Sequence, residues 1–597
     1  MFKSTIKNLD LSSIDFSTPL FPDVHDRAFW DAKVDDSLIR DAEKYLTYEW
    51  PIIKATDYME YKKTGNRLIM EDIHFGRRRA LVTLAISELM ENKGRFLPQI
   101  VNGIYAICEE SYWGVSAHWY CNIIGNIQSP QYPYIDLFAA HTAQLLSVIS
   151  KLLRDPLLAF CPEIIDRIDY EMDRRIFVPY LTHHDFWWMG YYKKVNNWNP
   201  WILSNVLVSF LLLENNPRRL REAVAKMLTE VTYYYDSMPE DGGCDEGPSY
   251  WARAGASMFE FFYQLKVATN GKLDFFADLK IKNIGSYITK VYIADGNVMN
   301  FGDGGQHITS CTLIYMYGKE TNQPEMMSLA SEITEVCRRK NLESGRSEIL
   351  DIRRVLYSIM HDDEIESVKI PFAPGSLQYL PDLQIAALRE GAWIAGVKGG
   401  NNGEFHNHND VGSFLLYENG TPVLVDAGVG DYTRQTFGKE RYTIWTMQSG
   451  YHNLPTVNGV DQKDGWKFRT RSFAAEEGCA KVSFASAYEE SAGLTELTRT
   501  VTLDENGATV IDCFAFQNGS GKVVEHLMTP YKPEIRGNTV ILDGKYAIDC
   551  DGGAISVDEV TFADNRKLSA SWPSKVLYRI NVAFADRDTV TLRIGRA

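Results

Sequence analysis

The sequence lacks the features of a disulfide-stabilised or exported protein. Its nine cysteines are an odd number, scattered along 597 residues with no CxxC pair. This pattern does not suit a disulfide framework and favours a reducing compartment. No apolar segment follows the charged N-terminal start, so no signal peptide is visible. We expect a cytoplasmic protein; a periplasmic or secreted location would require that a signal had been removed.

Long apolar runs and an excess of basic residues are also missing. The longest apolar stretches, such as Val206–Leu213, are far shorter than the ~20 residues of a membrane-spanning helix, so we expect no membrane partner. The net charge of −16 argues against nucleic acid as a partner, because phosphate binding needs clustered Lys and Arg. It argues only weakly against an acidic polysaccharide, since the local field of a groove can oppose the global sign.

The chain is too long for one hydrophobic core, and its first 360 or so residues have helical periodicity. Apolar residues recur there at positions i, i+3, i+4 and i+7, the pattern of a helix with one buried face. Examples are Arg79–Asn92, Leu137–Leu153, Trp201–Leu213, Arg219–Tyr235 and Trp251–Thr269. Aromatic and Gly-rich loops separate these segments, which favours an α/α toroid or solenoid over a parallel α/β sheet.

The periodicity changes near Pro371, after which short alternating runs predict strands. These runs are Gln384–Gly400, Ser413–Glu418, Pro422–Asp426, Glu496–Leu503, Ala508–Phe516 and Val590–Ile594. Asn419-Gly420 predicts a hairpin turn. The prediction is a multidomain α+β protein with an N-terminal extension (1–30), an (α/α) toroid (31–370) and a C-terminal antiparallel β-sandwich (371–597). Because pockets favour domain interfaces, we expect a catalytic cleft between the two large domains.

The densest polar cluster is His406-Asn407-His408-Asn409-Asp410, just before a predicted strand. In extended chain His406 and His408 would lie on one face about 7 Å apart, which suits one metal ligand beside one free acid–base group. With Asp426 at the end of a strand and His452 further on, His408 completes a His₂Asp set that fits zinc. No tight motif such as HExxH is present, and ordinary hydrogen bonding in polar loops is the alternative.

Two loops of the helical half carry the other candidates. The Gly- and Pro-rich segment Asp241–Tyr250 could present Tyr250 at a helix N-terminus, where the helix dipole favours a phenolate. The amides of Asn196 and Asn197 could bind a carboxylate and neutralise it by hydrogen bonding. The alternatives are a buried Tyr at a helix start, and an N-capping Asn199 followed by Pro200.

Together these segments resemble the heparinase II/III family of polysaccharide lyases. HNHNDVGSF, VDAG, GDYT at 430–433 and YHN resemble its β domain, whereas EESYWGVSAHW at 109–119, NNWN, EGPSYW and FGDGG resemble its α/α toroid. The motifs occur in the family's order over roughly residues 80 to 480. The resemblance implies β-elimination on an acidic glycan: the C5 proton of a uronic acid is removed, the 4-linked oxygen leaves, and a C4–C5 double bond remains.

The resemblance also implies a role for each residue. Asn197 neutralises the uronate carboxylate, Tyr250 is base or acid at the reacting ring, His406 is the complementary base, and Tyr432 lines the same catalytic site. The expected substrate-binding residues are His118, Trp119, Asn196, Trp198, Glu246 and Arg441. One structural zinc ion per chain would be held by His408, Asp426 and His452, where it fixes a β-domain loop rather than activating water.

Several relatives place a His where Trp198 or its neighbours fall, so the epimer that the site can deprotonate is open. Basic residues near the motifs are few (Lys193, Lys194, Arg434, Lys439 and Arg441), which favours a uronate oligosaccharide over heavily sulfated heparin.

Two other functions compete with the lyase. One is an α/α-barrel glycoside hydrolase that uses Asp245, Glu246 or Asp303 as paired carboxylates. The other is a non-catalytic glycan-binding protein. For the assembly, a homodimer is the expectation, because dimers are the commonest oligomers.

Overall fold

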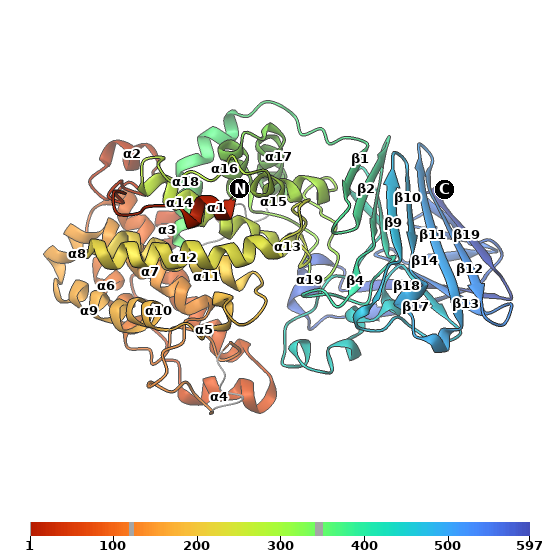
Figure 1. Cartoon of the computed structure of the whole chain (residues 1–597), viewed down its shortest axis with the longest axis horizontal. Coiled ribbons are helices and arrows are strands. Elements are labelled where there is room, and N and C mark those ends of the chain that lie inside the picture. The colour runs from red at the N-terminus through yellow and green to blue at the C-terminus, as the bar shows by residue number, and fades with distance from the viewer. Residues whose placement is uncertain (1, 119–124, 341–349) are drawn as a thin grey trace.

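The chain forms a helical half followed by a β half. The computed structural model describes all residues except 1, 119–124 and 341–349. Figure 1 shows the helices gathered on one side of the molecule and the sheets on the other. The predicted order, a helical region followed by antiparallel sheets, is confirmed. No helix in the described part of the chain is long and apolar enough to cross a membrane.

The helical half runs as far as Ser367. Its α-helices are α1 (Phe2–Lys7), α2 (Arg27–Ala32), α3 (Asp36–Glu43), α4 (Ala55–Thr64), α5 (Leu68–Glu91), α6 (Leu97–Cys108), α7 (Leu137–Leu152), α8 (Arg154–Phe160), α9 (Glu163–Met172), α10 (Val178–Thr182), α11 (Trp198–Leu213), α12 (Pro217–Ser237), α13 (Pro248–Trp251), α14 (Gly255–Ala268), α15 (Leu279–Val291), α16 (Cys311–Thr321), α17 (Pro324–Lys340) and α18 (Ile352–Ser367). Helices α7 and α11 are buried along most of their length and lie at the centre of the helical core.

Helix α11 begins three residues earlier than the periodicity predicts, at Trp198. Pro200 then falls in its first turn, where a missing N–H costs nothing because that donor has no partner inside the helix. Asn199 is therefore not the N-cap. Its side-chain amide donates instead to the carbonyls of Trp188 (2.9 Å) and Glu230 (3.1 Å), so the predicted capping role is wrong.

The β half begins at Leu377. Its strands are β1 (Leu377–Leu380), β2 (Ile385–Glu390), β3 (Trp393–Lys398), β4 (Asn401–Asn402), β5 (Phe414–Glu418), β6 (Thr421–Leu424), β7 (Pro455–Val457), β8 (Gly465–Arg469), β9 (Ser472–Glu476), β10 (Cys479–Ser483), β11 (Leu494–Asp504), β12 (Gly507–Phe516), β13 (Lys522–Thr529), β14 (Pro533–Arg536), β15 (Thr539–Leu542), β16 (Tyr546–Asp549), β17 (Ala554–Thr561), β18 (Val576–Ala585) and β19 (Thr589–Arg596), with α19 (Arg566–Ser571) between the last strands. They form antiparallel sheets ordered β1-β2-β3-β5-β6, β14-β15-β16-β19-β12-β11-β10-β9, β17-β18-β13-β7 and β4-β8.

The five-stranded sheet is buried on both faces and joins the two halves. Along its strands alternate side chains point to opposite faces. Ile385, Ala387 and Ile394 belong to the core shared with the helices, whereas Leu388 and Trp393 belong to the core shared with the eight-stranded sheet. A sheet that packs this way holds its own loops at fixed positions relative to the helical loops.

The predicted hairpin at Asn419-Gly420 joins β5 to β6. Asn419 and Gly420 have φ angles of 45° and 79°, and two consecutive positive φ values match the tight turn whose twist fits antiparallel strands. The chain beyond β6 therefore leaves the sheet at a fixed place, and this segment carries several of the side chains described next.

Candidate active site

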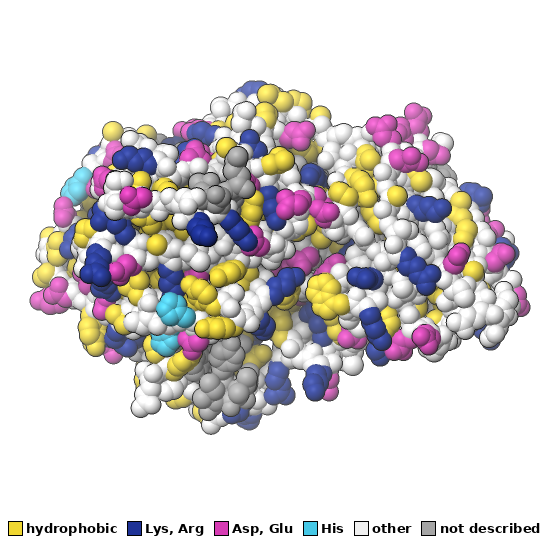
Figure 2. All heavy atoms as spheres, viewed as in Figure 1, with side chains coloured by type: hydrophobic (Ala, Val, Ile, Leu, Met, Phe, Trp, Pro, Cys, Tyr) yellow, Lys and Arg dark blue, Asp and Glu magenta, His cyan; other side chains and the backbone are white. Residues whose placement is uncertain are grey.

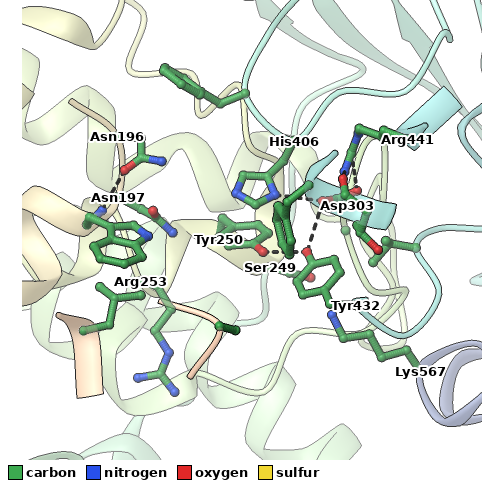
Figure 3. A pocket seen from close by; sticks show the side chains of 18 of the residues that line it. Asn196, Asn197, Ser249, Tyr250, Arg253, Asp303, His406, Tyr432, Arg441 and Lys567 are labelled. Carbon is green, nitrogen blue, oxygen red and sulfur yellow. Dashed lines mark hydrogen bonds and ion pairs between the residues drawn. The ribbon is translucent and has the colours of Figure 1, made fainter. Parts of the chain in front are cut away.

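A cavity of about 990 Å³ lies between the two halves, where the sequence predicts a cleft. Asn197 and Tyr250 line it from the helical half, and His406 and Tyr432 line it from the β half. Figure 3 shows these side chains around the pocket, with Tyr250 and His406 between the asparagines and Tyr432. Lys567 of α19 adds a cation from near the C-terminus, 3.3 Å from the centre of the Tyr432 ring.

The centre of the site is the carboxylate of Asp303, in the loop between α15 and α16. Its Oδ2 accepts hydrogen bonds from His406 Nδ1 (2.7 Å) and the Tyr432 hydroxyl (3.1 Å). Its Oδ1 accepts from His408 Nε2 (3.1 Å) and Arg441 Nη2 (2.7 Å). Each oxygen thus has two donors, and the side chain is 0% exposed.

These donors determine the charge of Asp303. Burial alone would raise its pKa, but the hydrogen bonds from His406 and His408 and the charge of Arg441 outweigh burial and hold the pKa well below its usual value. Asp303 is therefore an ionised, saturated carboxylate that orients its neighbours.

The two phenols at the site form a directed chain. The Tyr250 and Tyr432 hydroxyl oxygens lie 2.5 Å apart. Because the single proton of Tyr432 is donated to Asp303, Tyr250 must donate to Tyr432. Burial, followed by the charge of Asp303, raises the pKa of Tyr250 above its usual value. The phenolate predicted from a helix dipole is therefore wrong for the free protein, since α13 has four residues and burial dominates.

The loop that carries His406 is bent rather than extended. His406 has a φ of 54°, in the left-handed region, and its carbonyl accepts the backbone N–H of Asp303 at 3.1 Å. The expected extended segment with both imidazoles on one face is therefore wrong. The bend stacks the His406 ring on Tyr250, with 4.3 Å between ring centres, while His406 and His408 still meet at Asp303.

Asn197 and His406 share a second buried carboxylate, that of Glu246. Glu246 Oε1 accepts the backbone N–H of Asn197 at 3.2 Å, and Oε2 lies 3.6 Å from His406 Nε2. Burial raises the pKa of Glu246 to about 7. Among the described residues nothing hydrogen-bonds the buried Oδ1 of Asn197. Oδ1 is an acceptor, so a carboxylate ligand would have to accept its hydrogen bond from the Nδ2 group of the same amide.

The three predicted metal ligands converge. His408, Asp426 and His452 are buried, and one ligand atom from each lies within 4.8 Å of the others. His452 Nδ1 is 2.8 Å from Asp426 Oδ2. His408 Nδ1 and His452 Nε2 are buried without a hydrogen-bond partner in the described part of the chain. Burial lowers the pKa of His408, which favours the neutral imidazole that a metal requires.

The β half matches a known protein family. The family model described as heparinase II/III-like, C-terminal, matches residues 373–567. These residues are similar to the C-terminal domain of heparinase II/III-like proteins. Comparison of the whole chain with curated protein sequences gives no significant match.

Solved structures resemble the whole chain. Heparinase III is 11% identical, with 100% of this chain and 88% of that chain covered and a TM-score of 0.66. The heparan sulfate lyase HepC from Pedobacter heparinus is 15% identical, with 100% and 87% covered and a TM-score of 0.55. The Streptomyces coelicolor A3 chondroitin AC lyase in complex with chondroitin sulphate is 11% identical, with 94% and 82% covered and a TM-score of 0.51. At these identities the likeness shows a common fold.

The other predicted binding residues are placed unevenly around the cavity. His118, Asn196 and Trp198 line it from the helical half. Glu246 is 3% exposed and lies behind Asn197 and His406 rather than at the surface of the cavity. Arg441 of the β half lines the cavity, but its guanidinium donates to Asp303, Asn407 and Thr436. Trp119 lies outside the described residues.

The cavity also contains residues that the sequence did not identify. Asp303 had been considered only as a hydrolase carboxylate, although its motif FGDGG was noted. Arg67, Arg253 and Lys567 line the cavity as additional basic residues. Figure 2 shows Lys and Arg side chains beside the junction of the two halves, in a protein whose net charge is −16. Only the folded chain brings these basic residues together at the cavity, where Arg67 also pairs with Glu71 and Arg253 with Asp351.

Proposed function

We propose that the protein is a polysaccharide lyase that cleaves uronate-containing glycans by β-elimination. The observation that supports this most is the convergence, in one interdomain cavity, of a carboxylate-binding amide (Asn197), an imidazole (His406) and a neutral phenol donor (Tyr250). These are the groups that the reaction needs. The cations Arg67, Arg253 and Lys567 favour an acidic oligosaccharide or polysaccharide as the substrate.

The chemistry follows from the orientation of these groups. A proton at C5, next to a carboxylate, becomes acidic enough to remove only when the developing enolate charge is stabilised, which the Asn197 amide provides by hydrogen bonding. Asp303 takes the Nδ1 proton of His406 in a hydrogen bond, so Nε2 is the nitrogen that can accept the C5 proton. Tyr250, a neutral donor, protonates the departing 4-linked oxygen.

The stacking of Tyr250 and His406 restricts the stereochemistry. With 4.3 Å between their ring centres, a sugar ring cannot lie between them. Both groups approach the substrate from one side. They therefore suit a uronate whose C5 hydrogen and 4-linked oxygen lie on the same face, as in glucuronate and mannuronate, and the reaction they perform is a syn elimination.

The hydrolase alternative fits the geometry less well. A glycoside hydrolase needs two carboxyl groups that reach the substrate. Asp303 is 0% exposed and its oxygens are saturated by four donors, while Glu246 is 3% exposed. Neither carboxylate presents a free oxygen to the cavity, and Asp245, the third candidate, is not among the lining residues. The lining does include one further carboxylate, that of Glu404, whose side chain is 8% exposed, together with the phenols, the imidazoles, the Asn197 amide and basic side chains.

A panel of uronate glycans tests the proposed function. Purified protein is incubated with heparan, chondroitin, hyaluronan, alginate and glucuronan, and absorbance in the ultraviolet is followed, because a C4–C5 double bond conjugated with the carboxylate absorbs there. At least one substrate should give an absorbing product. Cleavage into products without this absorbance would favour the hydrolase, and binding without cleavage would favour a non-catalytic protein.

We also propose that His408, Asp426 and His452 hold one structural zinc ion. Two imidazoles and a carboxylate are a ligand set that zinc accepts, and the unpartnered nitrogens of His408 and His452 fit a ligand role. His408 donates its other nitrogen to Asp303, as metal-bound imidazoles commonly do to a carboxylate. The ion would fix the loop that also carries His406, and no catalytic step requires it.

Zinc removal should destabilise the wild-type protein. Elemental analysis should find about one zinc per chain. Free zinc at a concentration 100 times its Kd stabilises the folded state by about 2.7 kcal/mol. A chelator should therefore lower the midpoint of unfolding measurably. His408→Ala should lack zinc and should no longer respond to the chelator.

His526→Ala is the matched control. His526 is also buried in the β half, but it bonds Thr456 and Asn581 and lies outside the three-residue set. This variant should keep its zinc and its response to the chelator. A wild-type protein without zinc after growth in zinc-supplemented medium would contradict the proposal.

A further inference from the structure

Two contacts join the helical half to the β half beside one end of the cavity. The Arg434 guanidinium donates through Nη1 to the carbonyl of Lys62 at 3.0 Å. The same residue packs against the turn after α4, where a Cβ on Gly65 would lie 3.1 Å from the Cβ of Arg434. The second contact joins Arg566, at the start of α19, to Asp72 of α5, with Nη1 3.5 Å from Oδ1. We call these two contacts the bridge.

The bridge is part of the cavity wall. The helical residues that contact Arg434 lie between Tyr61 and Arg67 in the chain, and both of these line the cavity. On the β side, Arg434 lies between the lining residues Tyr432 and Thr436. Because the lining continues on both sides of the bridge, the wall at this end runs from one half of the molecule to the other.

The β side of the bridge is held together by one carboxylate. Asp431 accepts the backbone N–H groups of Arg566 at 2.8 Å and of Lys567 at 3.0 Å. Its own backbone N–H donates to the side chain of Asn565 at 3.2 Å. The segment that carries Arg434 is thus fixed to the first turn of α19, so the two contacts of the bridge support each other.

The catalytic groups define which part of a glycan points toward the bridge. In the proposed reaction the uronate carboxylate binds at Asn197 and the departing 4-linked oxygen lies at Tyr250. Figure 3 shows Tyr432 and Lys567 on the other side of Tyr250 from Asn197, and the two phenol oxygens are 2.5 Å apart. The sugar joined through the departing oxygen therefore extends toward Tyr432 and the bridge. In a 4-linked glycan this sugar is on the non-reducing side of the bond that breaks.

The end of the cavity beside the bridge presents an available cation. Lys567 is exposed in the cavity lining, and its ammonium lies 3.3 Å from the centre of the Tyr432 ring. Within the described part of the chain this ammonium forms no hydrogen bond or ion pair. Arg67 lines the cavity nearby, but its Nε already donates to Glu71 at 2.6 Å. Lys567 can therefore pair with an anionic group of a ligand.

We propose that the protein cleaves its substrate from the non-reducing end, and that the end of the cavity beside the bridge binds a short acidic terminal segment through Lys567. This inference rests on the proposed lyase function and names the part of the glycan on which the site acts. An enzyme that cuts within a chain needs a groove through which the glycan can pass in both directions. Here the bridge lies across that path, and the cavity of about 990 Å³ has the size of pockets that enclose whole small ligands.

The first test uses a uronate oligosaccharide of defined length that carries a fluorophore at its reducing end. Labelled products are separated by size at early times. The label should appear first in a product that has lost only one terminal segment, and later in successively shorter products. Each labelled product should also contain the double bond, because the new unsaturated uronate is its non-reducing end. Early appearance of labelled products of every length, or of the shortest one first, would overturn the inference.

The second test is Lys567→Met, which removes the charge and keeps a flexible side chain that can contact the Tyr432 ring. For an oligosaccharide with an acidic non-reducing terminus, KM should rise roughly 10- to 100-fold while kcat changes by less than about threefold, as expected for a lost hydrogen bond between charged groups. For the same oligosaccharide with a neutral terminal sugar, wild type and variant should have equal KM. An unchanged KM on the acidic substrate, or an equal rise on both substrates, would overturn the role of Lys567.

Lys266→Met is the matched control. Lys266 also has its ammonium over an aromatic ring, that of Phe276 at 5.6 Å, but it lies outside the cavity lining. This variant should leave KM and the order of the labelled products unchanged.

The outcomes separate this inference from the function on which it rests. If the wild-type protein forms no unsaturated product from any uronate glycan, the lyase proposal fails. If it forms unsaturated products of every length at once, the lyase proposal stands and cleavage from the non-reducing end is overturned.

Discussion

Tyr250→Phe is expected to lower kcat by roughly 10² to 10⁴ on any active uronate substrate while KM stays close to that of the wild type. The substitution removes one hydroxyl and keeps the ring, so the stacking on His406 that shapes the cavity is retained. In the free protein the Tyr250 hydroxyl donates to Tyr432 and Tyr432 donates to Asp303, so Tyr250 is the end of this chain whose proton can turn to the departing oxygen when substrate binds. The measurement is the initial rate of absorbance increase over a range of substrate concentrations.

The control for lost hydroxyl groups is Tyr58→Phe. Tyr58 donates to the carbonyl of Tyr112 at 3.0 Å in the helical half and does not line the cavity, so its loss should cost stability of about 1 kcal/mol and leave kcat unchanged. Near-wild-type turnover in Tyr250→Phe would remove this phenol from the chemistry. The lyase proposal would then rest on His406, Asn197 and the likeness of residues 373–567 to the heparinase II/III-like C-terminal domain.

The sequence predicted those parts of the fold that depend on interactions within one short segment. Alternation and the Asn419-Gly420 turn identified β5 and β6, because a hairpin turn and a two-residue period are properties of a short segment. The convergence of His408, Asp426 and His452 was predicted from their positions at strand ends, and their ligand atoms do lie close together. Whether they bind zinc stays a prediction.

The wrong predictions concern the pKa of one side chain, the conformation of one loop and the partners of one amide, all of which depend on residues distant in the sequence. The pKa of Tyr250 is raised because the folded protein buries the phenol beside Asp303, and no local dipole compensates. The backbone at His406 has a left-handed φ because its carbonyl accepts a hydrogen bond from the backbone N–H of Asp303, a residue more than a hundred positions away. Asn199 and Pro200 matched a capping pattern that α11 uses differently, since the buried amide of Asn199 finds carbonyl partners in neighbouring segments.

Asp303 itself was underestimated for the same reason. Its partners come from the loop before β5 and from the segment after β6, and they meet only when the five-stranded sheet packs against the helices. In the sequence, Asp303 is a single carboxylate in a Gly-rich loop, and nothing nearby in the sequence indicates that four side chains will donate hydrogen bonds to it. The residue therefore looked like a candidate acid, whereas the structure makes it the common partner of the proposed zinc site and of the catalytic groups.

Asp303→Asn should have the broadest effect of any single substitution. The substitution removes the negative charge that pairs with Arg441. It also replaces one acceptor oxygen by an NH₂ group, which cannot accept hydrogen bonds from the donors that this oxygen serves, such as His408 and Arg441. Breaking a buried ion pair from one side costs about 3–5 kcal/mol of folding free energy. Because Asp303 also orients His408, zinc affinity should fall by roughly 10- to 100-fold. With His406 and Tyr432 no longer oriented, kcat should fall at least as far as in Tyr250→Phe.

A buried aspartate elsewhere in the β half separates these effects from general destabilisation. Asp512 binds the buried Arg499, with Nε at 2.8 Å from Oδ1, and it lies in β12 away from the cavity. Asp512→Asn should lose a similar amount of stability but keep its zinc and, below its unfolding temperature, its turnover. Denaturant unfolding, zinc content and initial rates are measured for both variants. If Asp303→Asn loses no more zinc affinity and no more turnover than Asp512→Asn, the carboxylate is only a buried ion-pair partner. If both losses are confined to Asp303→Asn, one side chain links the metal loop to the catalytic groups.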